Sequence, residues 1–140
     1  MKTTYFIAIL LLAFNASSFS QRQIVGKWLS EDKEGITEIY EQAGQFYGKI
    51  VWLKKVNDDK GVPLKDTENL SPKLRQRPLL GLIVINNLSY NNKEWSKGSV
   101  YDPKSGKTYT CKIWLSNENT LNLRGYSGLF HSTEVWTRTK

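Results

Sequence analysis

Two arginines one residue apart form the most distinctive charged pair in this 140-residue chain. Arg75 and Arg77 lie in a long polar segment, and two guanidinium groups at this spacing can clamp a carboxylate or a phosphate with paired hydrogen bonds. The same pair can instead hold the segment in place through salt bridges to its own acidic residues. These are Asp58, Asp59, Asp66 and Glu68. The pattern leaves both interpretations open.

The remaining reactive side chains do not form a catalytic motif. His131 is the one histidine and could act as a general base near neutral pH. No motif places Ser127, Ser132 or Cys111 beside it as a nucleophile, and alternation puts Cys111 among inward apolar residues as an inert core thiol. One histidine and one cysteine also exclude an internal disulfide, a Cys-based zinc cluster and a two-His metal site. We therefore predict no catalytic residue, no metal and no cofactor.

Aromatic side chains are the other group that could recognise a ligand, since the chain has five Trp and seven Tyr. Strict alternation along a strand places Trp52 on the same face as Phe46 and Ile50, which predicts that Trp52 points inward. The aromatic residues predicted to line a ligand site are Tyr40, Tyr47, Trp52, Trp95 and Tyr101. Arg75 and Arg77 would stand at the rim of that site.

The elements that must position these residues are strands, because hydrophobicity alternates with a period of two rather than 3.6. Glycine-containing or turn-prone segments separate the alternating runs. The predicted strands are 24–30, 36–41, 46–55, 79–85, 94–102, 108–116, 120–126 and 129–139. Eight strands at this spacing, without a helix long enough to cross a parallel sheet, predict one all-β domain with an antiparallel up-and-down order.

Eight up-and-down strands tend to close into a barrel, because closure removes the exposed sheet edges. A barrel of eight strands can be filled by its own side chains or can hold one small ligand. One connection, 56–78, is much longer than the others, and a loop of that length in a small domain is commonly functional. We predict one turn of helix at 71–76 within it and place the loop at the barrel mouth.

The first twenty residues have the pattern of a secretory signal peptide. Lys2 gives a positive start, residues 5–14 form a short apolar run, and small residues precede Gln21. The apolar run is too short to span a bilayer. The sequence therefore predicts cleavage before Gln21, a mature domain at 21–140 without stable membrane insertion, and an exported location in a bacterial envelope, periplasmic or extracellular.

Positive charge is spread along the chain rather than gathered into one block. The formal net charge is +7, and removal of Lys2 with the signal leaves +6. Scattered charge is typical of a solvated surface, so we predict no nucleic-acid partner. Weak contact with an anionic envelope surface is the expected consequence.

The first and last strands carry a barrel-end motif. Gly26-Lys27-Trp28, together with Arg138, resembles the lipocalin signature, in which a first-strand indole packs across the closed barrel end under an arginine from near the C-terminus. Longer motifs extend the resemblance over most of the mature chain. They are EIYE at 38–41, YGKIVWLK at 47–54, LRQRPLLGL at 74–82, YDPKSGKTY at 101–109 and LRGY at 123–126.

Together these motifs resemble the domain-of-unknown-function 2147 family of small exported bacterial proteins. The resemblance implies a lipocalin-like, or calycin, barrel and an envelope location, and it implies no established activity. Three hypotheses follow. The chain is a non-enzymatic barrel that binds a small, partly apolar or anionic ligand. Alternatively, it has a filled barrel whose surface meets an anionic glycan, a lipid or a protein, or it is an enzyme of small-molecule chemistry.

Overall fold

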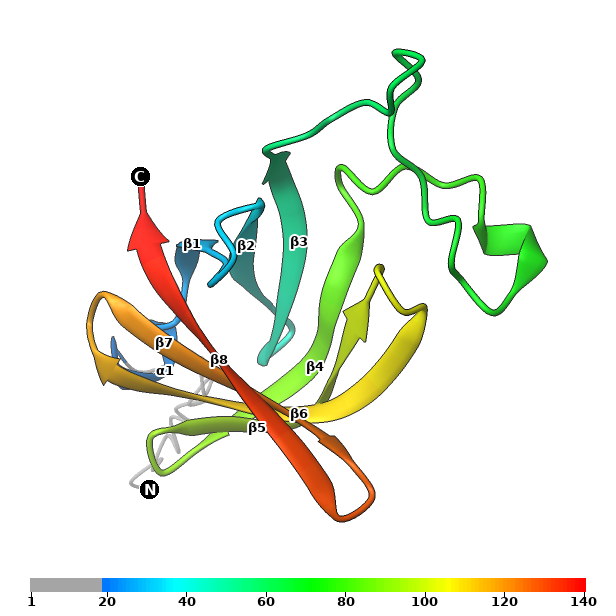
Figure 1. The fold of residues 1–140 in the computed structure, drawn as a ribbon. Coiled ribbons are helices and arrows are strands. Elements are labelled where there is room, and N and C mark those ends of the chain that lie inside the picture. Colours follow the sequence, from blue (N-terminus) through cyan, green and yellow to red (C-terminus); the bar gives the residue numbers. More distant parts are fainter. Residues whose placement is uncertain (1–18) are drawn as a thin grey trace, which may run out of the picture.

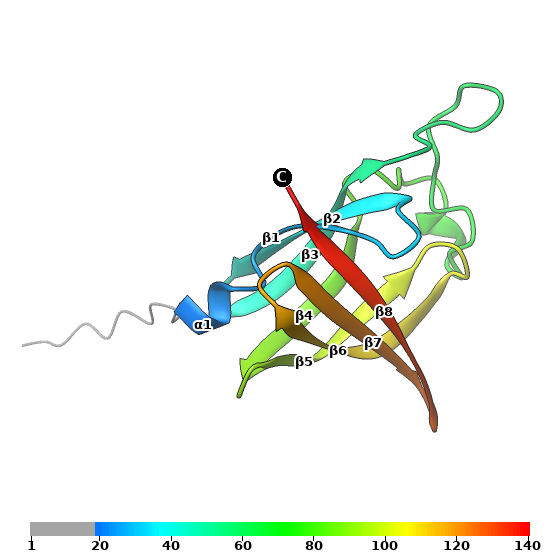
Figure 2. The same cartoon turned by 60° about the vertical axis from the view of Figure 1, so that its left-hand side comes forward.

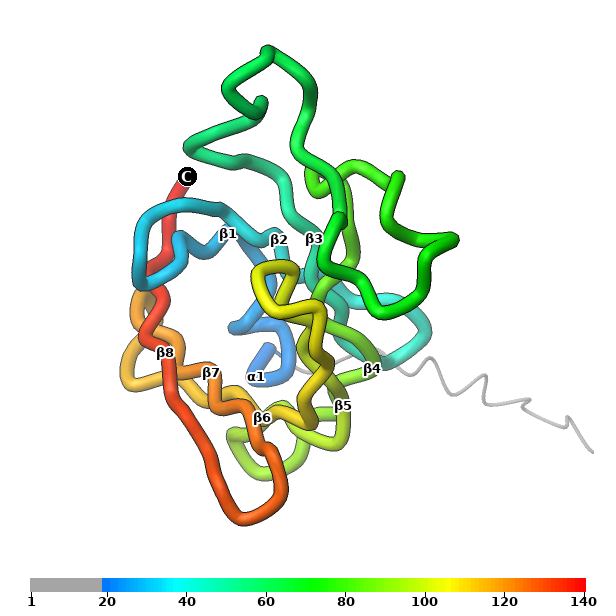
Figure 3. The backbone as a smooth tube through the Cα atoms, turned by 45° about the vertical axis from the view of Figure 1, so that its right-hand side comes forward, coloured from blue at the N-terminus to red at the C-terminus, as the bar shows by residue number. Residues whose placement is uncertain are grey.

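Eight antiparallel strands close into a barrel in up-and-down order in the computed structural model, which describes residues 19–140 (Figure 1). The strands are β1 (Gly26–Leu29), β2 (Gly35–Gln42), β3 (Gln45–Leu53), β4 (Ile83–Asn91), β5 (Glu94–Asp102), β6 (Lys107–Asn117), β7 (Thr120–Ser127) and β8 (Phe130–Thr139). Pairing of β8 with β1 completes the ring, which Figure 3 shows with α1 (Phe19–Arg22) inside its outline. The predicted all-β barrel is confirmed. Apart from Phe19 and Ser20, the predicted signal peptide lies outside the described residues.

One strand lies elsewhere than the apolar pattern indicated. The prediction of a strand at 79–85 was wrong in its bounds, because β4 begins at Ile83 and continues through polar residues to Asn91. Gly81 has a φ of 87°, and its N–H donates a hydrogen bond to the Ile50 carbonyl. The chain therefore turns at Gly81, and the residues before it are not part of the strand. A further left-handed residue, Asn87, interrupts the alternation within β4.

The two ends of the barrel carry different connections. The short β2–β3, β4–β5 and β6–β7 turns share one end with α1, and we call this the closed end. The β1–β2 loop, the β5–β6 turn, the β7–β8 hairpin tip and residues 54–82 lie at the other, the mouth. We call residues 54–82 the mouth loop, and it projects from the barrel at the end opposite α1 (Figure 2). It contains the 3-10 helix η1 (Pro72–Leu74), within the predicted helical turn.

Trp28 seals the closed end. Its ring is fully buried, its Nε1 donates to the Ile24 carbonyl at 2.8 Å, and the Arg138 guanidinium carbon lies 4.2 Å from the ring centroid. Arg138 also donates to the Val25 carbonyl at 2.9 Å. Gly26 has a φ of 139°, and a Cβ there would lie 2.5 Å from Arg138 Nη1. The glycine therefore makes room for the arginine that covers the indole, as the resemblance implied.

Large apolar side chains fill the barrel next to this seal. Phe46 and Trp95 meet edge to face with ring centroids 6.4 Å apart, and both are buried. Trp95 Nε1 donates to the Gln21 carbonyl at 3.0 Å, which ties the start of the described chain to the core. Other members of the same buried cluster are Ile39, Leu88, Ile113, Leu121 and Trp136. Within residues 19–140, no helix is long and apolar enough to cross a membrane.

Candidate functional site

The mouth half of the barrel is hollow. A cavity of about 1010 Å³ opens at the mouth, a size typical of sites for small molecules. Apolar residues from several strands and from the mouth loop make up much of its wall. They are Ile50, Leu53, Leu64, Leu79, Val84, Val100, Leu123, Phe130 and Trp136.

The cavity exists because the inward positions change in size along the barrel axis. Near the mouth, the lining includes Thr37, Gly125 and Ser132. A Cβ on Gly125 would lie 3.6 Å from the Tyr109 Cβ, an ordinary contact, and Gly125 has no positive φ. Neither strain nor crowding requires glycine at this position. Its effect is to leave space in the barrel interior.

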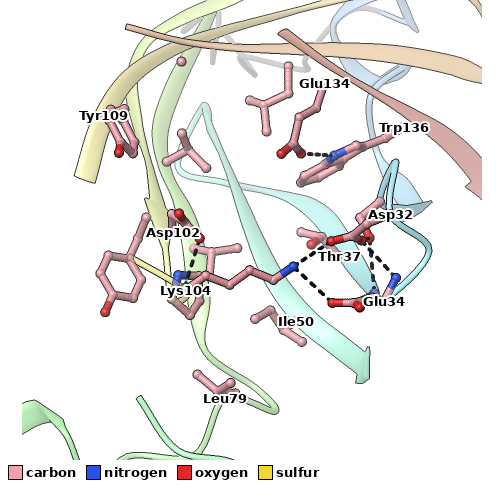
Figure 4. A pocket seen from close by; sticks show the side chains of 18 of the residues that line it. Asp32, Glu34, Thr37, Ile50, Leu79, Asp102, Lys104, Tyr109, Glu134 and Trp136 are labelled. Carbon is pink, nitrogen blue, oxygen red and sulfur yellow. Dashed lines mark hydrogen bonds and ion pairs between the residues drawn. The ribbon is translucent and has the colours of Figure 1, made fainter. Parts of the chain in front are cut away.

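A carboxylate reaches into this space. Glu134 on β8 pairs with the inward residue Leu123 on β7, and its side chain points into the cavity from above Trp136 (Figure 4). Trp136 Nε1 donates to Glu134 Oε2 at 2.9 Å. Trp136 is buried where the filled half of the barrel meets the cavity, so the indole fixes the carboxylate near the cavity floor.

An ion-pair clasp crosses the mouth. Lys104, in the β5–β6 turn, reaches across the pocket to the β1–β2 loop, where its Nζ lies 2.9 Å from Asp32 Oδ2 and 3.0 Å from Glu34 Oε2 (Figure 4). A hydrogen bond from the Ser30 hydroxyl, together with Lys104, lowers the pKa of Asp32 to about 2. Asp32 and Glu34 in turn raise the pKa of Lys104. Asp32 and Lys104 are therefore both charged at neutral pH.

The two arginines singled out in the sequence serve the mouth loop itself. Arg77 Nε lies 2.8 Å from Asp66 Oδ2, and Asp66 is completely buried while Arg77 is 37% exposed. Arg75 Nε donates to the Asn69 carbonyl at 2.7 Å. The salt-bridge interpretation describes Arg77, whereas Arg75 is held by a backbone carbonyl, and neither residue lines the cavity.

Asp66 is the centre of this arrangement. Its carboxylate accepts hydrogen bonds from the Tyr101 hydroxyl at 2.5 Å and from the Asn69 amide at 2.9 Å, besides the Arg77 contact. Burial opposes ionisation of Asp66, but these three donors outweigh it and lower the pKa of the carboxyl. The pKa of Tyr101 is raised, mainly by burial and to a smaller extent by the hydrogen bond to Asp66. Gly106 packs so closely that a Cβ would collide with the Glu68 carbonyl oxygen. The mouth loop is thus joined to the β5–β6 turn.

The five aromatic residues predicted to line a site do not come together. Only Tyr101 lines the cavity among them, and Trp95 is part of the closed-end core. Tyr40 and Tyr47 stack on each other at 5.8 Å away from the cavity. The prediction that Trp52 faces inward was wrong. An irregularity between Ile36 and Thr37 in the β2–β3 pairing shifts the register, and Trp52 is 42% exposed.

Of the other reactive candidates, His131, Ser127 and Ser132 line the cavity near the β7–β8 tip, and Cys111 lies apart from them. His131 is exposed beside the mouth, with its ring 5.9 Å from that of Tyr126. Cys111 is buried in the wall, and burial raises the pKa of its thiol to about 12, which keeps it protonated. Among the described residues, no three His, Cys, Asp or Glu side chains gather in an arrangement that could hold a metal ion.

Sequence reasoning missed Glu134, Trp136 and Lys104 as site residues. Alternation along β8 offered a signal for two of them, because Glu134 and Trp136 share a face with Arg138, which was already placed at the barrel end. The clasp had no such signal, since Lys104 and Asp32 are 72 positions apart in the chain. Their proximity depends on closure of the barrel.

A closed eight-stranded barrel with one sealed end and one open end is the architecture of a lipocalin-like protein. A solved structure, protein HP1028 from the human pathogen Helicobacter pylori, described as belonging to the lipocalin family, matches with a TM-score of 0.69. The match has 24% sequence identity and covers 84% of this chain and 83% of that one, which shows a shared fold. No match was found among curated proteins.

A family model identifies the chain more closely. The model described as "Uncharacterized protein conserved in bacteria (DUF2147)" matches residues 26–138. The chain therefore belongs to this family. The matched segment starts at Gly26 and ends at Arg138, the two residues that meet over Trp28 at the closed end.

Proposed function

We propose that this protein is a non-enzymatic carrier or sensor that binds a small, largely apolar molecule inside the mouth half of its barrel. The observation that carries the proposal is the cavity of about 1010 Å³, which opens only where the mouth loop and the clasp lie. Walls made of aliphatic and aromatic side chains with a few polar groups are typical of small-molecule sites. The apolar part of the ligand would lie against Val84, Val100 and Leu123.

The cavity favours this function over a filled barrel that acts only through its outer surface. It does not favour an enzyme, since Lys104, Asp32 and Glu34 are paired with one another, and the ring of His131, which also lines the cavity, packs beside Tyr126. The resemblance of the fold to a member of the lipocalin family agrees with a ligand-holding interior. The acidic ligand predicted from Arg75 and Arg77 has no support from the cavity lining.

Titration with an uncharged apolar fluorescent probe, N-phenylnaphthylamine, tests the proposal. The wild type should bind one probe molecule per chain with a saturable rise in fluorescence. The Gly125→Phe variant should bind at least about tenfold more weakly, because its ring fills space that the backbone leaves free without strain. Val135→Phe is the matched control, since Val135 is an exposed neighbour on β8 that does not line the cavity.

Loss of binding in Gly125→Phe with retention in Val135→Phe supports an internal site. Equal binding by the wild type and Gly125→Phe would place the probe on the outer surface and overturn the proposal. Thermal melts of all three proteins establish that the comparison is between folded molecules.

We also propose that the barrel acts outside the bacterial cytoplasm after removal of residues 1–20. The support is the sequence pattern of the N-terminus. A chain that begins at Gln21 loses Phe19 and Ser20 from α1 but keeps the Gln21 carbonyl that accepts the Trp95 hydrogen bond. Intact-mass measurement of envelope-purified protein tests this, and a mass that still includes Met1 would contradict it.

A further inference from the structure

We propose that the cavity selects an apolar amine, and that Glu134 is the residue that receives its ammonium group. This inference rests on the proposed function and adds the chemistry of the ligand's polar end. The carboxylate of Glu134 lines the open cavity, where the residue is exposed to solvent and accepts a hydrogen bond from the buried Trp136. It is placed to meet the head of a molecule whose body fills the cavity.

The carboxylate has unused hydrogen-bonding capacity. A carboxylate can accept about four hydrogen bonds, and within residues 19–140 the structure gives Glu134 one partner, Trp136 Nε1 at 2.9 Å. No cation forms an ion pair with it in that part of the chain. A ligand that displaces water from the cavity must therefore supply donors of its own, or the carboxylate loses its hydration without compensation.

Most other charged side chains of the lining have partners of their own. Lys104 is shared between Asp32 and Glu34, so the clasp carries one more negative than positive charge. Lys55 pairs with Asp59 outside the cavity at 2.9 Å. Asp102 accepts hydrogen bonds from the Lys104 N–H and the Ser105 hydroxyl within its own turn.

Lys54 also lines the cavity, but it follows directly on the mouth end of β3, whereas Glu134 is hydrogen-bonded to the buried Trp136 indole. The interior therefore presents negative charge to a bound ligand.

Three ligand heads meet this carboxylate differently. An ammonium group donates charge-assisted hydrogen bonds to it. A hydroxyl donates one neutral hydrogen bond, which is weaker. A carboxylate head offers no donor and adds like-charge repulsion. The expected order of affinity is amine, then alcohol, then acid, at a constant apolar body.

Matched eight-carbon probes measure this order. Octylamine, octanol and octanoate are titrated at neutral pH, below their aggregation limits, by intrinsic tryptophan fluorescence and by displacement of N-phenylnaphthylamine. We expect octylamine to bind at least about tenfold more tightly than octanoate, with octanol between them. In Glu134→Gln, octylamine should lose most of that advantage while octanol changes by no more than about twofold.

Glu68→Gln is the charge-matched control, because Glu68 is exposed on the mouth loop and does not line the cavity. It should keep the wild-type order. Retained octanol binding by Glu134→Gln shows that this variant is folded with an open cavity. If Glu134→Gln does not fold, the order of affinity of the three probes for the wild type alone tests the preference for an amine.

The outcomes separate the two proposals. Equal affinity for all three probes, or tightest binding of octanoate, overturns the role of Glu134 and leaves the binding barrel standing. If the preference for the amine survives in Glu134→Gln, the selectivity arises at the rim of the cavity. That result also overturns the role of Glu134. Absence of binding by every probe and by N-phenylnaphthylamine overturns the proposed function itself.

Discussion

The closed end and the mouth of this barrel are built from the same eight strands but differ in the size of their inward-facing side chains. At the closed end, Trp28, Phe46 and Trp95 fill the interior, and the indole N–H groups of both tryptophans are hydrogen-bonded to backbone carbonyls. At the mouth, smaller residues such as Gly125 leave a cavity, and polar contacts join loops across it. The difference shows that one half of the barrel holds a packed core and the other half leaves a cavity, which is where we propose that a ligand binds.

Removal of the closed-end seal should have the largest effect on stability. Trp28→Ala is expected to lower the free energy of unfolding by about 3 to 5 kcal/mol, because it empties a fully buried indole site and removes the ring beneath Arg138. Denaturant unfolding measures the loss. A loss below about 1 kcal/mol would mean that this end does not carry the stability of the barrel.

The buried carboxylate of the mouth loop should have the next largest effect. Asp66→Asn removes the negative partner of Arg77, but Arg77 is partly exposed and can turn to water. We therefore expect a loss of about 1 to 3 kcal/mol in the free energy of unfolding.

Replacing Arg75 and Arg77 together by Ala should likewise lower the melting temperature and leave probe affinity of the folded fraction unchanged. Loss of probe affinity without loss of stability would instead favour a ligand clamp.

The contribution of the Asp66 carboxylate to stability should depend on pH in the acid range. The folded-state pKa of Asp66 is lowered, so its ionisation stabilises the fold fully above the unfolded value of about 4. This stabilisation is lost as pH falls through the lower folded value. The stability difference between wild type and Asp66→Asn should therefore be constant near neutral pH and shrink below about pH 4. A difference that stays constant down to the acid-unfolding limit would show that the charge of Asp66 contributes nothing.

The clasp should have the smallest effect on stability and a visible effect on ligand exchange. Lys104→Gln is expected to cost no more than about 1 kcal/mol, because the lysine side chain is 70% exposed and water screens the pair. Association and dissociation of N-phenylnaphthylamine, measured by stopped-flow fluorescence, should both become faster. High salt should move the wild-type rates toward those of the variant.

Lys107→Gln, at the first residue of β6 directly after the same turn and outside the cavity lining, is the control for a general change of surface charge. If Lys104→Gln and Lys107→Gln exchange the probe at the wild-type rate, the ion pairs across the mouth do not restrict entry.

The same contrast explains what the sequence could predict. The closed end was predictable because Gly26, Trp28 and Arg138 resemble the barrel-end motif of lipocalins, and that resemblance implied their packing. The strands were predictable because alternation is local, and the errors occurred where alternation breaks, as at Asn87 in β4 and at the register shift before Trp52. Local rules carry no information about such irregularities.

The cavity itself was not predictable at the level of residues. Its lining comes from β2 to β8 and from the mouth loop, so it depends on the register of every pairing at once. Arg75 and Arg77 drew attention as a charged pair, but their partners Asn69 and Asp66 lie in the same loop. The charge that faces the cavity, Glu134, is a single residue in an ordinary strand.

Nuclear magnetic resonance of the five tryptophan indole N–H groups tests the division between the two ends most directly. The Trp136→Phe variant assigns the signal of the indole that lines the cavity, and the Trp95 and Trp28 indoles at the closed end serve as internal references. Saturating N-phenylnaphthylamine should shift the Trp136 signal and leave those of Trp28 and Trp95 in place. A shift confined to other tryptophans, with Trp136 unchanged, would show that the barrel interior is not where this protein binds an apolar molecule.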